Sequence, residues 1–251
     1  MNRIFDDSAY ITPGTVTQYA NTNEAFLRLP VRGIVLELPG LGGGSCLGGS
    51  MERQDYATPQ AKSFGEAGIV LAYLFPGPWS WGNPGAVRMA DGVVSALAEK
   101  YGLPEHFPLA VCGGSMGGQG ALLYAADTRF PLSCVAAACP CVDVPLAYSI
   151  RLEFPRTFFS AAAGMDLPMD KALERLSPLH RMEDLPETDY YICSNGADEL
   201  FPEEEICRFT EKLRERGRNV TYRCQPETFH GQFFPEVREE LHTFLLEHIL
   251  A

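Results

Sequence analysis

The chain has 251 residues, 46% of them hydrophobic and 21% charged, and a formal net charge of −12 at pH 7. The composition is typical of a soluble globular protein, and its acidic balance would repel polyanions, which excludes nucleic acid as an expected partner. No stretch approaches the roughly 20 apolar residues of a membrane helix, and the N-terminal residues lack the apolar run of a signal peptide. We therefore expect a cytoplasmic protein with no membrane partner, folded as one domain over residues 1–251.

Short apolar runs alternate with helical patterns along the chain, which favours βαβ units and a parallel sheet. The pattern predicts strand 33–38, helix 55–67, strand 69–75, helix 83–101, strand 108–112, helix 116–126 and strand 132–138. After residue 185 it predicts strand 189–194, helix 202–216, strand 219–224 and helix 237–250. Between these halves, residues 141–185 hold prolines, aromatic residues and only one short helical pattern, near 169–176, which indicates a small cap inserted into the domain.

A glycine-rich turn follows the third of these strands. It reads Gly113-Gly114-Ser115-Met116-Gly117, and a helical pattern starts directly after it. This is the Gly-x-Ser-x-Gly sequence of a nucleophile elbow in its strand–turn–helix context. A side chain at either flanking glycine would collide with the neighbouring strand or helix, and the turn lifts the serine hydroxyl above the sheet. The motif predicts Ser115 as a nucleophile; the alternative is a glycine-rich turn without chemistry.

A serine hydroxyl is a weak nucleophile until a base accepts its proton. Of the five histidines, His230 follows the last predicted strand, at the carboxyl end where active sites of such sheets gather. We predict His230 as the general base, with His180 in the cap as the alternative.

The base in turn needs a carboxylate that orients it. Asp198 lies in the loop just beyond strand 189–194, and the chain order Ser115, Asp198, His230 is that of hydrolase triads. We predict Asp198 as the acid. Its neighbour Glu199 and Asp143, which follows the preceding strand, are alternatives.

Two backbone N–H groups are needed to stabilise an oxyanion. The residue after the nucleophile, Met116, should supply one of them. The glycine-rich loop after strand 33–38 lets backbone approach a ligand closely and should supply the other, from Leu41 or, as the alternative, from Gly42. The same loop lacks the Gly-Lys-Ser/Thr ending of a phosphate-binding loop, so no nucleotide is expected there.

Several segments together resemble the α/β-hydrolase superfamily. They are Leu38-Pro-Gly-Leu-Gly, Gly113-Gly-Ser-Met-Gly-Gly, Gly196-Ala-Asp-Glu-Leu-Phe-Pro202, Phe229-His-Gly and Ser177-Pro-Leu-His180. The chain is most similar to the catalytic domain of the prolyl oligopeptidase branch and its short esterase relatives. The resemblance implies a mostly parallel sheet of about eight strands with helices on both faces. It also implies acyl transfer through an acyl-serine intermediate, and no cofactor.

The substrate class is inferred from the length of the chain rather than from a motif. The large peptidases of that branch carry a propeller domain for which this chain has no room, so we expect a carboxylesterase acting on small or short acyl esters. A serine peptidase or amidase with the same triad is the main alternative, and a non-catalytic binding protein of this fold is the other. Trp79 and Trp81, beyond strand 69–75, are candidates for a substrate pocket, or else pack under the cap. Cys139-Pro-Cys141 has a spacing shorter than zinc motifs use, so no metal site is expected.

Overall fold

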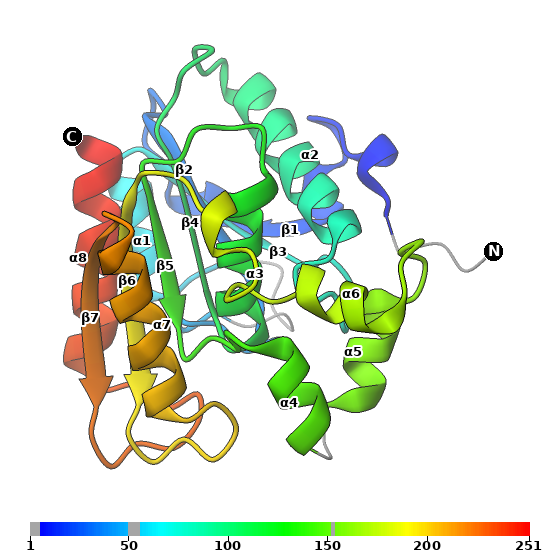
Figure 1. Cartoon of the computed structure of the whole chain (residues 1–251). Coiled ribbons are helices and arrows are strands. Elements are labelled where there is room, and N and C mark those ends of the chain that lie inside the picture. The colour runs from blue at the N-terminus through cyan, green and yellow to red at the C-terminus, as the bar shows by residue number, and fades with distance from the viewer. Residues whose placement is uncertain (1–5, 50–55, 152–153) are drawn as a thin grey trace.

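The computed structural model describes residues 6–49, 56–151 and 154–251. Its centre is a seven-stranded sheet in the order β1-β3-β2-β4-β5-β6-β7 (Figure 1). The strands are β1 (Ala20–Thr22), β2 (Gly33–Leu38), β3 (Ile69–Leu74), β4 (Leu109–Gly114), β5 (Cys134–Ala138), β6 (Asp189–Asn195) and β7 (Asn219–Gln225). Strand β1 pairs antiparallel with β3, and the remaining pairs are parallel. The mostly parallel sheet is confirmed, with seven strands in the described residues where about eight were expected.

Helices cover both faces of this sheet. They are α1 (Pro59–Glu66), α2 (Pro84–Tyr101), α3 (Met116–Asp127), α4 (Val144–Ile150), α5 (Pro155–Ala162), α6 (Met169–Arg175), α7 (Glu203–Glu215) and α8 (Pro235–Leu250). In Figure 1, α1 and α8 lie on one side of the sheet, and α2 and α3 lie on the other. Single-turn 3₁₀ helices add η1 (Ser8–Tyr10), η2 (Val16–Gln18), η3 (Glu24–Phe26) and η4 (Met182–Asp184). The arrangement is that of an α/β-hydrolase.

The alternation of side chains along each strand divides the core into two clusters, one on each face of the sheet. On β2, Ile34 and Leu36 belong to the cluster that also contains residues of α2, α3 and α7, while Val35 between them belongs to the cluster with residues of α1 and α8. All six residues of β2 are buried. A strand buried on both faces reads as a continuous apolar run, which is the pattern that identified it in the sequence.

Local signals set where the helices begin. Helix α2 starts with Pro84 at its first position, and the side chain of Asn83 accepts a hydrogen bond from the Ala86 N–H. Thr58 caps α1 in the same way, so the helix expected from residue 55 begins at Pro59. Residue 55 itself lies outside the described residues.

The cap segment holds more helix than its sequence pattern indicated. Three helices, α4 to α6, occupy it, whereas the pattern predicted one, and residues 152–153 lie outside the described part. Helices α4 and α5 span only seven and eight residues, each with a proline in the first turn. About two turns are too few for an apolar period to be recognisable, and proline at the start of a helix costs nothing because the first N–H groups have no partner in the helix. That these helices act as a cap stays a prediction.

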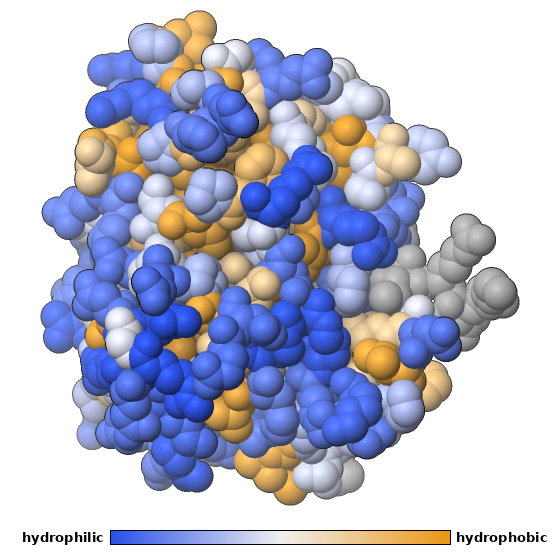
Figure 2. Space-filling model, turned by 45° about the horizontal axis from the view of Figure 1, so that its top comes forward, coloured by the Kyte–Doolittle hydropathy of each residue, from blue (hydrophilic) through white to orange (hydrophobic). Residues whose placement is uncertain are grey.

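The surface is consistent with the acidic composition. The face in Figure 2 carries mainly hydrophilic residues, with hydrophobic ones in separate groups. Among the described helices, none combines the length and the apolar composition needed to cross a lipid bilayer.

A buried asparagine holds the antiparallel edge of the sheet in place. Asn23, which is fully buried, donates hydrogen bonds from Nδ2 to the carbonyl oxygens of Ala61 (2.9 Å) and Ile69 (3.0 Å). Its Oδ1 accepts a bond from the Leu71 N–H at 2.9 Å. The side chain thereby ties the segment after β1 to both α1 and β3.

We expect Asn23→Ala to lower the free energy of unfolding by about 2–4 kcal/mol, because it leaves buried polar groups without partners. Urea denaturation followed by circular dichroism measures this change. Asn219→Ala is the matched control, since Asn219 is exposed and bonds only to Asp189 Oδ1, and it should change stability by less than about 0.5 kcal/mol. Equal losses for the two variants would contradict the role given to Asn23.

Candidate active site

The turn between β4 and α3 has no room for side chains at its glycines. A Cβ atom on Gly117 would lie 2.0 Å from the carbonyl oxygen of Leu38, and one on Gly113 would lie 2.3 Å from the carbonyl oxygen of Gly117. Both obstacles are backbone atoms, which cannot move aside without disturbing the sheet. Ser115 itself has φ 56° and ψ −122°, a conformation that L-residues rarely adopt. The Ser115 N–H donates to the carbonyl oxygen of Ala138 at 2.8 Å, which fixes the turn against the end of β5.

Three side chains from distant parts of the chain meet at this turn. Ser115 Oγ lies 2.8 Å from His230 Nε2, and His230 Nδ1 lies 2.7 Å from Asp198 Oδ2. The carboxylate of Asp198 is fully buried, while the imidazole of His230 is 18% exposed. The order serine–imidazole–carboxylate is the arrangement in which a histidine can accept the serine proton while a carboxylate orients its ring.

Asp198 is held rigidly by the backbone that follows it. Its Oδ1 accepts hydrogen bonds from the N–H groups of Leu200 (2.8 Å) and Phe201 (3.0 Å), which leaves Oδ2 to face the histidine. The ring of Phe201 also packs edge-on against His230, with centroids 5.2 Å apart. Both ends of the Asp198–His230 contact are therefore fixed before any ligand enters.

The structure does not bring the alternative residues to the serine. Asp143 caps α4, where its side chain accepts a hydrogen bond from the Leu146 N–H at 3.1 Å. Glu199 is exposed. The imidazole of His180 bonds through Nδ1 to Ser177 Oγ, at 3.0 Å.

One residue that the sequence analysis did not identify joins the two loops that carry the acid and the base. Asn195, fully buried at the end of β6, donates from Nδ2 to Thr228 Oγ1 and to the carbonyl oxygen of Gln232, both at 2.7 Å. The Ala197 N–H also donates to the carbonyl oxygen of Thr228 at 2.9 Å. The only sign in the sequence was a polar residue at the carboxyl end of an apolar strand.

The two backbone N–H groups predicted to stabilise an oxyanion have no partner among the described residues. Neither the Leu41 nor the Met116 N–H donates a hydrogen bond to any of them. Met116 begins α3, so its N–H belongs to the positive end of the helix dipole. The loop of Leu41 is closed by a bond from the Gly40 N–H to the Gly44 carbonyl oxygen at 2.8 Å, and Gly42 in it has φ 79°.

A cavity of about 270 Å³ opens beside the hydrogen-bonded triad. Its lining comprises Gly40, Leu41, Gly44, Ser45, Cys46, Gly114, Ser115, Cys139, Leu200, His230, Gly231 and Phe233. Among these described residues, His230 is the only one with an ionisable nitrogen or carboxylate, and most of the remaining surface is apolar. The cavity therefore suits a small neutral group next to the serine.

The two tryptophans of the predicted pocket do not line this cavity. Trp81 is completely buried, its Nε1 donates to Thr157 Oγ1 at 3.0 Å, and its ring lies 4.3 Å from that of Phe158 between centroids. The Arg156 guanidinium lies 4.7 Å from the ring centre of Trp79. Both tryptophans thus contact α5, which is the packing arrangement that the sequence left open as the alternative.

Cys139, which the sequence analysis considered only for its spacing from Cys141, lines the cavity beside Ser115. The ligand atoms of Cys139, Asp198 and His230 all lie within 4.8 Å of one another. Burial, together with the nearby Asp198 carboxylate, raises the pKa of the Cys139 thiol to about 12. A neutral thiol is a poor metal ligand, and the nearest atoms of Asp198 and His230 are already bonded to each other.

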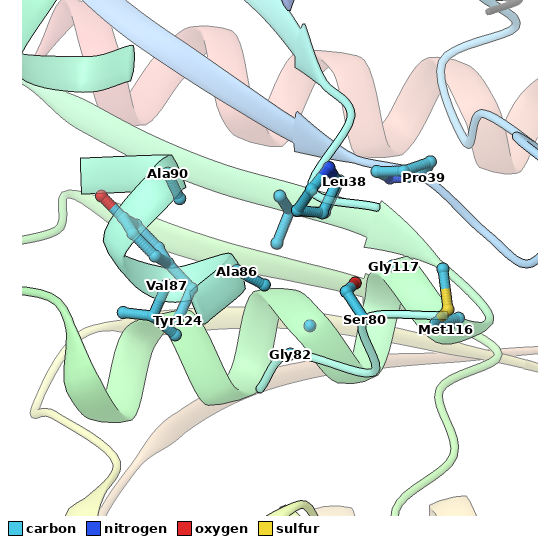
Figure 3. A pocket seen from close by; sticks show the side chains of 12 residues that line it. Leu38, Pro39, Ser80, Gly82, Ala86, Val87, Ala90, Met116, Gly117 and Tyr124 are labelled. Carbon is cyan, nitrogen blue, oxygen red and sulfur yellow. The ribbon is translucent and has the colours of Figure 1, made fainter. Parts of the chain in front are cut away.

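A second, much smaller cavity lies behind the turn, among Leu38, Ser80, Met116 and Gly117 (Figure 3). Its volume is about 10 Å³, roughly the space of one water molecule. It is too small for a substrate, and the side chain of Met116 beside it is buried in the core.

Comparison with solved structures supports the architecture. Acylaminoacyl peptidase from Pyrococcus horikoshii superposes with a TM-score of 0.68, at 12% identity, over 88% of this chain and 37% of that chain. A puromycin hydrolase mutant complexed with PGG gives 0.66, at 19% identity, over 87% and 33%. Esterase B from Lactobacillus rhamnosis gives 0.64, at 14% identity, over 90% and 78%. The chain thus spans about a third of the length of the first two proteins and 78% of the esterase.

No curated protein matches the sequence closely enough to be compared. A family match does exist, and it covers well over half of the chain, from residue 81 to residue 251. That segment includes the Ser115 turn and the loops that carry Asp198 and His230. The chain belongs to the prolyl oligopeptidase family of serine hydrolases.

Proposed function

We propose that this protein is a carboxylesterase for small or short acyl esters, with Ser115 as nucleophile, His230 as general base and Asp198 as the orienting acid. The observation that carries the proposal is the continuous hydrogen-bonded chain from Ser115 Oγ through His230 to Asp198, at the floor of a mainly apolar cavity. The three cap helices of residues 141–185 complete the proposed domain.

In the first half of the reaction, Ser115 Oγ attacks the acyl carbon while its proton passes to His230 Nε2. The Nδ1–H of His230 donates to Asp198 Oδ2, which stabilises the imidazolium that forms. The tetrahedral intermediate then collapses, His230 returns the proton to the leaving alcohol oxygen, and the acyl group remains on Ser115. In the second half, water takes the place of the alcohol and the same histidine accepts its proton.

The negative charge of each intermediate falls on the former carbonyl oxygen. The N–H groups of Leu41 and Met116 are the proposed donors to it, one from the loop after β2 and one from the start of α3. Donors that are fixed in place before the reaction stabilise the transition state without reorganisation, and loss of one such donor costs about 10²–10³ in kcat in a well-studied protease.

Two features favour esters over peptides. The described lining of the cavity offers no carboxylate or cation, apart from His230, to bind the charged ends of a peptide. In addition, the chain matches the fold of esterase B over 78% of that protein's length, against 37% for the acylaminoacyl peptidase and 33% for the puromycin hydrolase.

Matched substrates test the choice between ester and amide. We expect p-nitrophenyl butyrate to be hydrolysed with a kcat/KM well above that of butyryl p-nitroanilide, because the two share an acyl group and differ in the leaving atom. A preference for the anilide, or for an N-acylated peptide, would support the peptidase alternative instead.

The nucleophile and base are tested by their removal. Ser115→Ala and His230→Ala should each lower kcat on the order of 10⁶-fold, because each removes a member of a unit that acts together. A fluorophosphonate probe should label the wild-type protein on Ser115 and leave Ser115→Ala unlabelled, as mass mapping of the adduct will show. A wild-type protein that folds but stays unlabelled would contradict the mechanism and favour a binding role.

The acid is tested by a matched pair. Asp198→Asn should lower kcat by about 10⁴-fold, since an amide favours the wrong tautomer of His230. Asp143→Asn is the control and should leave kcat unchanged, because asparagine caps a helix as well as aspartate does. The reverse result would identify Asp143 as the acid.

A further inference from the structure

A carboxylate lies buried beneath the loop that carries Leu41. Glu37 occupies the second-last position of β2, and its exposed fraction is zero. It is the single charged residue in an otherwise apolar strand of six. Burying a carboxylate is costly unless hydrogen bonds replace the lost water, so the contacts that surround Glu37 reveal why it is tolerated.

Those contacts come from residues 45–47, directly after the loop, and from Tyr56. Glu37 Oε1 accepts from Ser45 Oγ (2.6 Å), the Leu47 N–H (3.1 Å) and Cys46 Sγ (3.3 Å). Glu37 Oε2 accepts from the hydroxyl of Tyr56. We call these five residues the Glu37 cluster. Burial raises the pKa of the Glu37 carboxyl, and the four donors act against that rise.

Two members of the cluster reach the cavity of the candidate active site. Ser45 and Cys46 line the cavity together with Leu41 and Ser115. The hydroxyl of Ser45 also accepts from the Gly49 N–H at 2.8 Å, which bends the chain back over Glu37.

A second anchor holds the other side of the loop. The hydroxyl of Tyr73, on β3, donates to the carbonyl oxygen of Gly43 at 2.7 Å. The segment from Gly40 to Gly44 is thus fixed by Tyr73 within it and by the Glu37 cluster immediately after it. Between these anchors and the end of β2, the N–H groups of Leu41 and Gly42 donate no hydrogen bond to the described residues.

We propose that Glu37 is a positioning residue for the oxyanion hole: its carboxylate holds residues 45–47 so that the Leu41 N–H stays aimed at the carbonyl oxygen of a substrate bound at Ser115. This inference rests on the proposed function. A displaced donor loses most of its benefit in the transition state and little in substrate binding, and misplacement by about 1 Å can cost as much as 10²-fold in rate. The signature is a fall in kcat with a nearly constant KM.

Three variants and one control test the proposal with p-nitrophenyl butyrate. Glu37→Gln removes the charge but keeps the shape of the side chain, Tyr56→Phe removes one donor, and Ser45→Ala removes another. Because Ser45 is only half-buried, Ser45→Ala can still test the proposal if Glu37→Gln fails to fold. We expect kcat to fall by about 10- to 100-fold in each, with KM within about threefold of wild type. Tyr190→Phe, which removes a buried hydroxyl bonded to the Pro186 carbonyl oxygen, is the matched control and should lower only the melting temperature.

The affinity for an inhibitor that forms a tetrahedral adduct separates the two roles of Glu37, because a residue that only stabilised the fold would not change it. The affinity for an alkyl trifluoromethyl ketone, whose adduct places an oxyanion in the hole, should fall in proportion to kcat/KM across the three variants and stay at the wild-type value in Tyr190→Phe. Unchanged kcat and ketone affinity in folded Ser45→Ala and Tyr56→Phe would overturn this inference while leaving the proposed triad intact. An inactive, unlabelled wild-type protein would overturn both.

Discussion

The contact between Gly117 and the carbonyl oxygen of Leu38 sets the geometry of everything around the candidate active site. Because the two backbones touch, α3 must start directly against the end of β2, and Ser115 is forced into its strained conformation. The same closeness places the start of α3, and with it Met116, next to the loop that follows Leu38. Tight packing thus determines, in a single step, the conformation of Ser115 and which segments adjoin it.

The other half of the site depends on hydrogen bonds rather than on steric exclusion. Asp198 and His230 belong to separate loops, which Asn195 joins from below. The cost of burying the Asp198 carboxylate is offset by two backbone N–H groups and the imidazole. A rigid serine turn and a pair of tethered loops therefore meet with Ser115 Oγ and His230 Nε2 already at bonding distance.

Much of this could be predicted from the sequence because the responsible forces are local. Apolar runs define strands buried on both faces, and the two glycines around Ser115 are dictated by the steric demands of one turn. The direction of Trp81 could not be predicted, since it depends on Thr157 and Phe158, which are far along the chain in α5. Helices of about two turns, such as α4, are too short for their apolar residues to show a helical repeat, so the sequence did not predict them. Strand β1, with three residues, is likewise too short to show an alternating pattern.

The role of Asn195 escaped prediction because its partners lie in a different loop. Glu37 left one sign, a carboxylate inside an apolar strand, but its meaning became visible only when the donors of the following loop were seen around it. In both cases the sequence shows that a polar group is buried, and the fold alone shows what it holds.

The hydrogen bond between Ser115 and His230 joins residues that are 115 positions apart in the chain. The serine follows the central strand β4 and is synthesised in the first half of the protein, whereas the histidine follows β7, at the edge of the sheet and close to the C-terminus. The two side chains can meet only when β4 and β7 both occupy their places in the one sheet. Under the proposed mechanism, a growing or partly folded chain would leave Ser115 without its base, and the recovery of activity would report the end of folding rather than its beginning.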